Sequence, residues 1–128
     1  MEQAFPRAAA RQVVEEILET VERYPVNFPI EVRFVAADDA LLSPAAERET
    51  VYVAVHNSVG MPWEAMFRAV AAVGDRHDAR PHWGKRHFHT AETLEPRYPE
   101  WHAFQAHRRH YDPEGRFANA HVRRVLGA

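Results

Sequence analysis

Apolar residues recur at helical spacing in four stretches of the chain. Residues 7–24 place them on one stripe with charged side chains opposite, which predicts an amphipathic helix. The same spacing predicts a second helix over residues 62–74, a third that begins around Pro99, and a short last helix over residues 119–127 that its first asparagine caps. The third helix is expected to bury three aromatic side chains: Trp101, Phe104 and Tyr111.

Two other stretches alternate between apolar and polar or small residues. This alternation, over residues 30–36 and 50–57, predicts two strands. Residues 79–85 favour a short extended segment, because Pro81 biases the residue before it away from helical angles. The expected core side of the first strand carries Ile30, Val32 and Phe34, and its other side carries Glu31, Arg33 and Val35.

The order of these elements predicts an α+β fold in which helices cover one face of a small antiparallel sheet. At 128 residues the chain is long enough for one hydrophobic core, and no stretch of it resembles a linker. Residues 1–128 are therefore expected to form a single domain. The uncovered face of the sheet is left for a ligand or a partner.

Composition narrows the classes of protein that the chain can represent. With 46% hydrophobic and 27% charged residues, the sequence is typical of a folded globular domain. No apolar run approaches the ~20 residues of a membrane-spanning helix, and a formal charge of -2 gives nucleic-acid binding little electrostatic support. The absence of cysteine excludes disulfides, thiolate zinc sites and thiol nucleophiles, and it fits a reducing cytoplasm.

Three polar residues are predicted to share the uncovered face of the sheet. Glu31 and Arg33 lie two positions apart on one strand and so project from the same side, and His56 lies on the side of the next strand opposite its valines. Guanidinium donors beside carboxylate acceptors suit a polyhydroxylated ligand such as a polyol or a sugar lactone. An ion pair on a solvated sheet face explains the same spacing, and both interpretations stay open at this point.

Basic and aromatic residues are dense over residues 82–89. This segment holds three histidines and Lys85, the single lysine among the sixteen Lys and Arg residues. His82, His87 and His89 lack the spacing of a standard metal site, so no metal is expected. The five glycines form no phosphate-binding loop, which means that another domain would have to hold most of any nucleotide cofactor.

Several motifs together resemble the C-terminal region of the aldonolactone oxidases. This group of FAD-linked oxidases includes D-arabinono-1,4-lactone oxidase, L-gulonolactone oxidase and alditol oxidase. The specific motifs are Pro-His-Trp-Gly-Lys at residues 81–85 and Asp-Pro-x-Gly-x-Phe-x-Asn at residues 112–119, whereas Glu-x-Arg at residues 31–33 is less specific. The resemblance spans nearly the whole chain in order, and residues 1–6 look like an internal stretch of the family.

The resemblance implies roles for five residues. Glu31 and Arg33 match the pair with which the family holds and orients the substrate's hydroxyl groups, and His56 lies where relatives place polar substrate-contacting residues. Lys85 and His82 of the Pro-His-Trp-Gly-Lys motif are expected at the flavin cofactor. Hydride transfer to flavin N5 leaves negative charge near N1 and the C2 carbonyl, which an ammonium group stabilises. The resemblance therefore assigns catalysis to Lys85 together with Glu31 and Arg33.

The resemblance implies that the chain is the substrate-binding, or cap, domain of an FAD-dependent oxidase of a sugar-1,4-lactone or an alditol. This domain is expected to have a ferredoxin-like fold and to be truncated relative to the family. Because the FAD-binding domain is missing from the sequence, oxidoreductase activity is expected only when such a domain is joined in cis or supplied in trans, with oxygen or another acceptor taking the electrons. The expected location is the cytoplasm, including the periphery of a membrane. A stand-alone sugar-binding or interaction module without redox activity is the alternative.

Overall fold

A computed structural model describes residues 1–127 and confirms the α+β fold. The strands are β1 (Glu2–Pro6), β2 (Glu31–Val35), β3 (Thr50–Ala54) and β4 (Arg80–Pro81). The helices are α1 (Ala10–Val21), α2 (Glu64–Arg76), α3 (Ala91–Leu94), α4 (Trp101–Tyr111) and α5 (Ala120–Leu126). The four predicted helices correspond to α1, α2, α4 and α5, and the two predicted strands correspond to β2 and β3.

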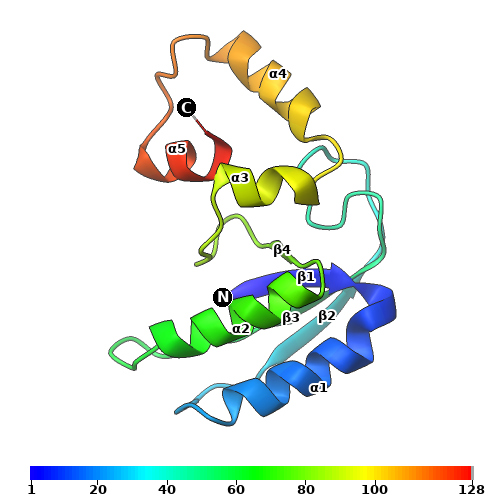
Figure 1. Cartoon of the computed structure of the whole chain (residues 1–128), viewed down its shortest axis with the longest axis vertical. Helices are drawn as coiled ribbons and strands as arrows, with labels where there is room; N and C mark the ends of the chain where they lie inside the picture. The colour runs from blue at the N-terminus through cyan, green and yellow to red at the C-terminus, as the bar shows by residue number, and fades with distance from the viewer. Residues whose placement is uncertain (128) are drawn as a thin grey trace.

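The four strands form one antiparallel sheet in the order β2-β3-β1-β4 (Figure 1). The first residues of the chain thus supply an inner strand, β1, where the sequence pattern predicts none. Residues 1–5 are all buried, with polar Glu2 and Gln3 among them. This segment therefore lacks the alternation that identifies a half-buried strand.

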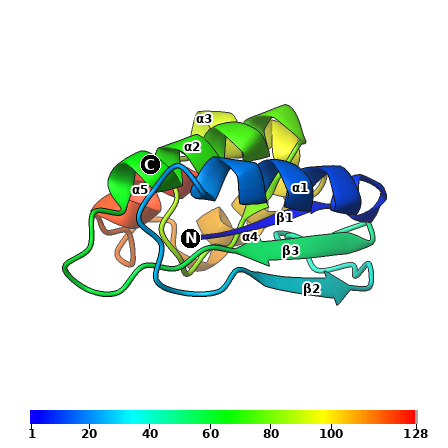
Figure 2. The same cartoon turned by 90° about the horizontal axis from the view of Figure 1, so that it is seen from below.

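Helices α1 and α2 cover one face of the sheet, as the sequence predicts (Figure 2). Their apolar stripes pack against the side chains of β1 and β3 that point toward them, including Phe5, Val51 and Val53. The helices contribute the rest of this core: Val13, Ile17, Val21, Met66, Phe67, Val70 and Val73. Contacts of the Glu16 carboxylate in α1 with Arg76 and His77 at the end of α2 join the two helices.

The prediction that Val32 and Phe34 belong to the core is wrong. Both side chains point to the helix side of the sheet, but Phe34 is 60% exposed and Val32 is also exposed. The reason is the position of β2 at the edge of the sheet, beyond the core that α1 and α2 form over β1 and β3. Alternation identifies the two sides of a strand but does not indicate whether anything covers them.

Helices α3, α4 and α5 lie together beyond β4 instead of over the sheet (Figure 1). They enclose a second, smaller core of Leu94, Tyr98, Trp101 and Val125. Buried Arg80 of β4 connects this group to the sheet, since it donates hydrogen bonds to the carbonyl oxygens of Ala46 at 2.7 Å and Arg97 at 2.6 Å.

Only part of the predicted aromatic face of α4 is buried. Trp101 is buried as expected and Phe104 is half-buried, but Tyr111 is 79% exposed. The prediction for Tyr111 is wrong because the second core contains the start of α4 and not its last turn.

The contrast between the inner strand and the edge strand can be tested with two matched substitutions. Phe5 and Phe34 lie opposite Val51 from either side of β3, yet Phe5 is fully buried. Phe5→Ala should lower the free energy of unfolding by about 3–5 kcal/mol because it leaves a cavity in the main core. Phe34→Ala should cost less than about 1 kcal/mol. Urea unfolding of both variants checks this, and equal losses would contradict the assignment of the core.

Candidate functional site

Charged side chains meet on the face of the sheet that α1 and α2 do not cover. The strand register places Glu31 of β2 and Glu2 of β1 on either side of Ala54 in β3. Arg33 lies opposite Tyr52 in the neighbouring row. Because the methyl group of Ala54 is small, side chains from the two flanking strands can approach each other across β3. We call Glu2, Glu31, Arg33, His56 and Lys85 the polar face.

The structure brings together the three residues that the sequence places on this face. Arg33 Nη1 lies 3.7 Å from Glu31 Oε1, and His56 Nε2 lies 3.6 Å from Glu31 Oε2. His56 follows β3, which ends at Ala54 and not at residue 57 as predicted. These contacts confirm the predicted placement of the three residues on one face. All three side chains are partly exposed to solvent, so their polar atoms are accessible to a ligand.

The carboxylate of Glu2 is the centre of this arrangement. Only 2% of the residue is exposed, although its side chain points to the uncovered face. Arg33 Nη2 donates a hydrogen bond to Glu2 Oε1 at 2.6 Å, and the ammonium group of Lys85 donates one to Glu2 Oε2. A buried charge is costly unless it is paired, and here each carboxylate oxygen has its own cation.

These contacts determine the charge state of Glu2. Burial alone would raise the pKa of the Glu2 carboxyl, but the hydrogen bond from Lys85 and the charges of Lys85 and Arg33 lower that pKa below its usual value of 4.5. Glu2 is therefore ionised at neutral pH. Its negative charge holds two positive charges from different parts of the chain in one place.

Sequence reasoning missed Glu2. The sequence motif assigns Lys85 to the flavin and indicates no partner for it within the chain, whereas the structure pairs Lys85 with a carboxylate 83 residues away. The available signal in the sequence was the carboxylate of Glu2 itself, directly before residues 3–6. Its role becomes apparent only when β1 is known to lie between β3 and β4.

A shallow hollow lies beside this carboxylate. It measures about 270 Å³ and is lined by Glu2, Arg33, Val35, Tyr52 and His82. His82 belongs to it because its backbone N–H donates to the carbonyl of Glu2 at 3.1 Å, and its ring Nδ1 accepts from the N–H of Gly84 at 3.1 Å. The hollow combines hydrogen-bond donors and acceptors on a sheet face, a chemical character that suits a small polar ligand.

The other two histidines of residues 82–89 do not reach the polar face. His87 is buried beside Trp83, His89 and His121, and neither of its ring nitrogens has a hydrogen-bond partner. Burial, with a smaller contribution from the charge of Arg124, lowers the pKa of His87 to about 4, so this ring is neutral at pH 7. Across residues 1–127 no three histidine or acidic side chains are grouped so that they could hold a metal ion.

Comparison with known proteins bears directly on this face. A model of the D-arabinono-1,4-lactone oxidase family matches residues 1–125. The chain belongs to this family. The match includes every residue of the polar face and of the hollow, and all residues of the helices that follow except Leu126 at the end of α5.

Individual members of the D-arabinono-1,4-lactone oxidase family show the same extent of similarity. The chain is 50% identical over 129 residues to an L-gulono-1,4-lactone dehydrogenase of Mycobacterium tuberculosis, 38% identical over 131 residues to an alditol oxidase of Streptomyces, and 32% identical over 130 residues to an L-gulonolactone oxidase of Mus musculus. These matches cover 96–99% of the chain but only 30–31% of each relative. The chain thus spans about a third of the length of these family members.

The helices of this D-arabinono-1,4-lactone oxidase family member are short. In the part of the chain that the structure describes, none has both the length and the apolar character that a membrane crossing requires.

The pairing of Glu2 predicts how stability depends on pH. Because the pKa of Glu2 is lower in the folded chain than its ordinary 4.5, the pairing stabilises the fold above about pH 4.5, and this stabilisation is lost as the pH falls through the lower, folded pKa. Glu2→Gln should cost about 1–3 kcal/mol of unfolding free energy at pH 7. The difference from the unsubstituted chain should shrink toward pH 3.

Urea unfolding of both proteins at a series of pH values measures this difference. Glu31→Gln is the matched control, because Glu31 is a half-exposed carboxylate on the same face, and it should cost less than about 1 kcal/mol at pH 7. A Glu2→Gln effect of the same size at pH 3 and pH 7 would contradict the ionised pairing.

Proposed function

We propose that this chain is the substrate-binding part of an FAD-dependent oxidoreductase that oxidises a carbinol of a sugar-1,4-lactone or an alditol. The observation that carries the proposal is the convergence of Arg33 and Lys85 on the buried Glu2 carboxylate, with Glu31 and His56 beside them on an uncovered sheet face. Membership of the D-arabinono-1,4-lactone oxidase family supports this class of substrate.

The polar face has the chemistry to bind a polyhydroxylated ligand. Each hydroxyl group of a sugar lactone or alditol both donates and accepts a hydrogen bond. Glu31 supplies acceptors, Arg33 supplies fixed donors, and the ring nitrogens of His56 supply either. Since all three side chains are partly exposed, they can exchange water for ligand hydroxyls without moving a core element.

The charges around the hollow fit the edge of a flavin. The cofactor, when bound, would accept hydride from the carbinol C–H, and oxygen or another acceptor would then take the electrons. Lys85 is a third exposed, so its ammonium group keeps N–H donors beyond the one that contacts Glu2. We assign Lys85 and His82 to the cofactor, with the positive charge of Lys85 stabilising the negative charge that the flavin gains on reduction.

Glu2 adds a positioning role to this assignment. A free lysine side chain samples many rotamers, whereas one that is paired with a buried carboxylate is confined. Glu2 therefore fixes the place of the ammonium group before any ligand binds. Catalysis in this proposal rests on Lys85, Glu31 and Arg33, which contact ligand atoms, and Glu2 acts through Lys85 and Arg33.

The cofactor needs more protein than this chain offers. Relatives of about three times the length contain polypeptide beyond the matched region, and we assign the binding of most of the FAD to that part. Such a domain can be joined to the chain in cis or supplied in trans. In either arrangement, the polar face forms one wall of the active site.

Reconstitution in trans tests the proposed function. The partner is the part of the Mycobacterium tuberculosis relative outside the matched region, loaded with FAD and mixed with this chain. The chain alone should be colourless and inactive, and the mixture should show bleaching of the flavin absorbance on anaerobic addition of L-gulono-1,4-lactone. A mixture that forms a complex but leaves the flavin oxidised with lactones and alditols would contradict the proposal. Lactone binding by the flavin-free chain, with no reduction in the mixture, would favour a stand-alone sugar-binding module.

Substitution of Lys85 tests its assigned role. In the reconstituted protein, Lys85→Met should slow flavin reduction roughly 10- to 1000-fold, the loss expected for one charge that stabilises the transition state. Lys85→Arg keeps the positive charge and should stay within about tenfold of the unsubstituted rate. Stopped-flow absorbance measures the reduction, and lactone affinity should change less than the rate. Unchanged reduction in Lys85→Met would limit Lys85 to its structural pairing with Glu2.

A further inference from the structure

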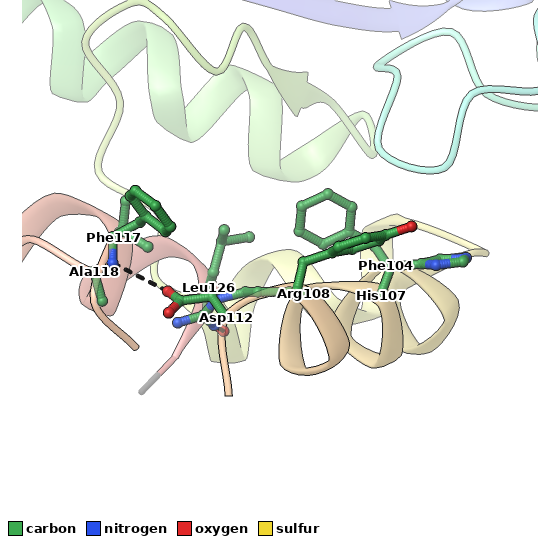
Figure 3. Close-up of a pocket in the computed structure, with 9 residues that line it drawn as sticks. Phe104, His107, Arg108, Asp112, Phe117, Ala118 and Leu126 are labelled. Carbon is green, nitrogen blue, oxygen red and sulfur yellow. Dashed lines mark hydrogen bonds between the residues drawn. The ribbon is translucent and has the colours of Figure 1, made fainter. Parts of the chain in front are cut away.

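An apolar groove lies between α4 and α5, away from the residues of the polar face. It measures about 370 Å³, and its lining includes five large aromatic or aliphatic side chains and the small Ala118; the large ones are Phe104, Tyr111, Phe117, Val122 and Leu126. Figure 3 shows Phe117 and Leu126 on the α5 side of this α4–α5 groove and Phe104 on the α4 side. Phe117 is 82% exposed and Tyr111 is 79% exposed, so two large rings face water at one site.

Phe117 lies in a turn that hydrogen bonds to the Asp112 carboxylate hold in place. Asp112 Oδ1 accepts a hydrogen bond from the N–H of Arg116 at 2.7 Å. Asp112 Oδ2 accepts one from the N–H of Phe117 at 3.1 Å, which Figure 3 shows as a dashed line. After the turn, the side chain of Asn119 caps α5 by accepting from the N–H of Val122 at 2.9 Å. The backbone that carries the exposed ring is thus already fixed, which lowers the entropy cost of binding through it.

The surroundings of the groove are basic. Residues 101–127 contain five arginines and two carboxylates, a balance of +3 (5 minus 2), whereas the whole chain carries -2. Arg109 and Arg123 are exposed beside the groove, and the half-buried Arg108 in its wall donates to the carbonyl oxygens of Leu126 and Gly127. A partner that fits this surface has an apolar centre and an acidic rim.

We infer that the α4–α5 groove is the surface on which the rest of the family's polypeptide docks, that is, the part of the relatives outside the matched region. This inference rests on the proposed function only for the identity of the partner, which is the FAD-binding part. The docked partner inserts apolar side chains beside Phe104 and Phe117 and places carboxylates near Arg109 and Arg123.

The length of the relatives supports this choice of partner. Their matched region covers 30–31% of each chain and corresponds to almost all of this one, including both walls of the groove. The remaining part of about 70% has to pack against the matched region if the two parts share one active site. The α4–α5 groove offers that part an apolar docking surface.

The charge around the groove argues against a second copy of this chain as the occupant. In a symmetric dimer through this groove, the same arginines would face each other, and like charges at an interface oppose association. A partner of opposite charge is therefore favoured over self-association.

The experiment uses this chain and the FAD-loaded partner part of the Mycobacterium tuberculosis relative, with binding measured by calorimetry. Phe117→Asp should weaken binding about tenfold or more, because it places a carboxylate at the apolar centre of the interface. Phe117→Tyr keeps the ring and should bind within about threefold of the unsubstituted chain. Val59→Asp is the matched control, since Val59 is fully exposed in the loop before α2, and it should bind normally. Thermal unfolding verifies that each variant folds.

The readouts separate this inference from the proposed function. In the mixture with Phe117→Asp, the rate of flavin reduction should recover when this chain is added at saturating concentration. In the mixture with Lys85→Met, the rate should stay low at saturating concentration. Normal binding by Phe117→Asp in a complex that reduces its flavin would overturn the docking surface and leave the proposed function intact. Failure of the unsubstituted chain to bind the partner, or dissociation of a dimer of this chain by Phe117→Asp, would also overturn the docking surface.

Discussion

A single buried carboxylate determines the arrangement of the polar face. Glu2 lies on an inner strand, on the sheet face that α1 and α2 leave uncovered, and is nevertheless almost inaccessible to solvent. Its charge requires partners, and these come from the edge strand through Arg33 and from the segment after β4 through Lys85. The same contacts that satisfy Glu2 therefore draw the two assigned cations together. In the proposed function, ligand chemistry on this face depends on that pairing.

The rest of the fold leaves this face accessible. The apolar stripes of α1 and α2 pack mainly against the opposite side of β1 and β3, and the remaining helices gather around a second core beyond β4. Among the surfaces that this packing leaves exposed are the polar face and the apolar α4–α5 groove. Our account gives them complementary uses: the polar face receives substrate and the edge of the cofactor, and the α4–α5 groove receives the protein that holds the cofactor.

Local patterns predict much of this molecule. Helices α1, α2, α4 and α5 follow from their apolar stripes, whereas the sequence pattern does not predict α3. The shared side of Glu31, Arg33 and His56 follows from a period of two residues along each strand. The asparagine cap of the last helix is also as predicted. The periods and the cap depend only on residues close in sequence, which is why one sequence suffices to find them. The contact of His56 with Glu31 also needs the pairing of β2 with β3.

The features that sequence reasoning missed depend on distant parts of the chain. Strand β1 is buried on both faces, so it has no alternation to identify it, and the role of Glu2 appears only when Lys85 is brought beside it. The exposure of Phe34 reflects the place of β2 at the sheet edge, and the exposure of Tyr111 reflects the extent of the second core. In each of these cases tertiary packing decides the outcome.

The claim that Glu2 and Lys85 form one unit is tested most directly by a double-mutant cycle. Unfolding free energies of the chain, of Glu2→Gln, of Lys85→Met and of the double variant are measured in urea at pH 7. We predict a coupling of about 1–3 kcal/mol, because each single change removes the same interaction and leaves the other partner without it. Losses that add within about 0.3 kcal/mol would contradict the account, since Lys85 would then be independent of the buried carboxylate.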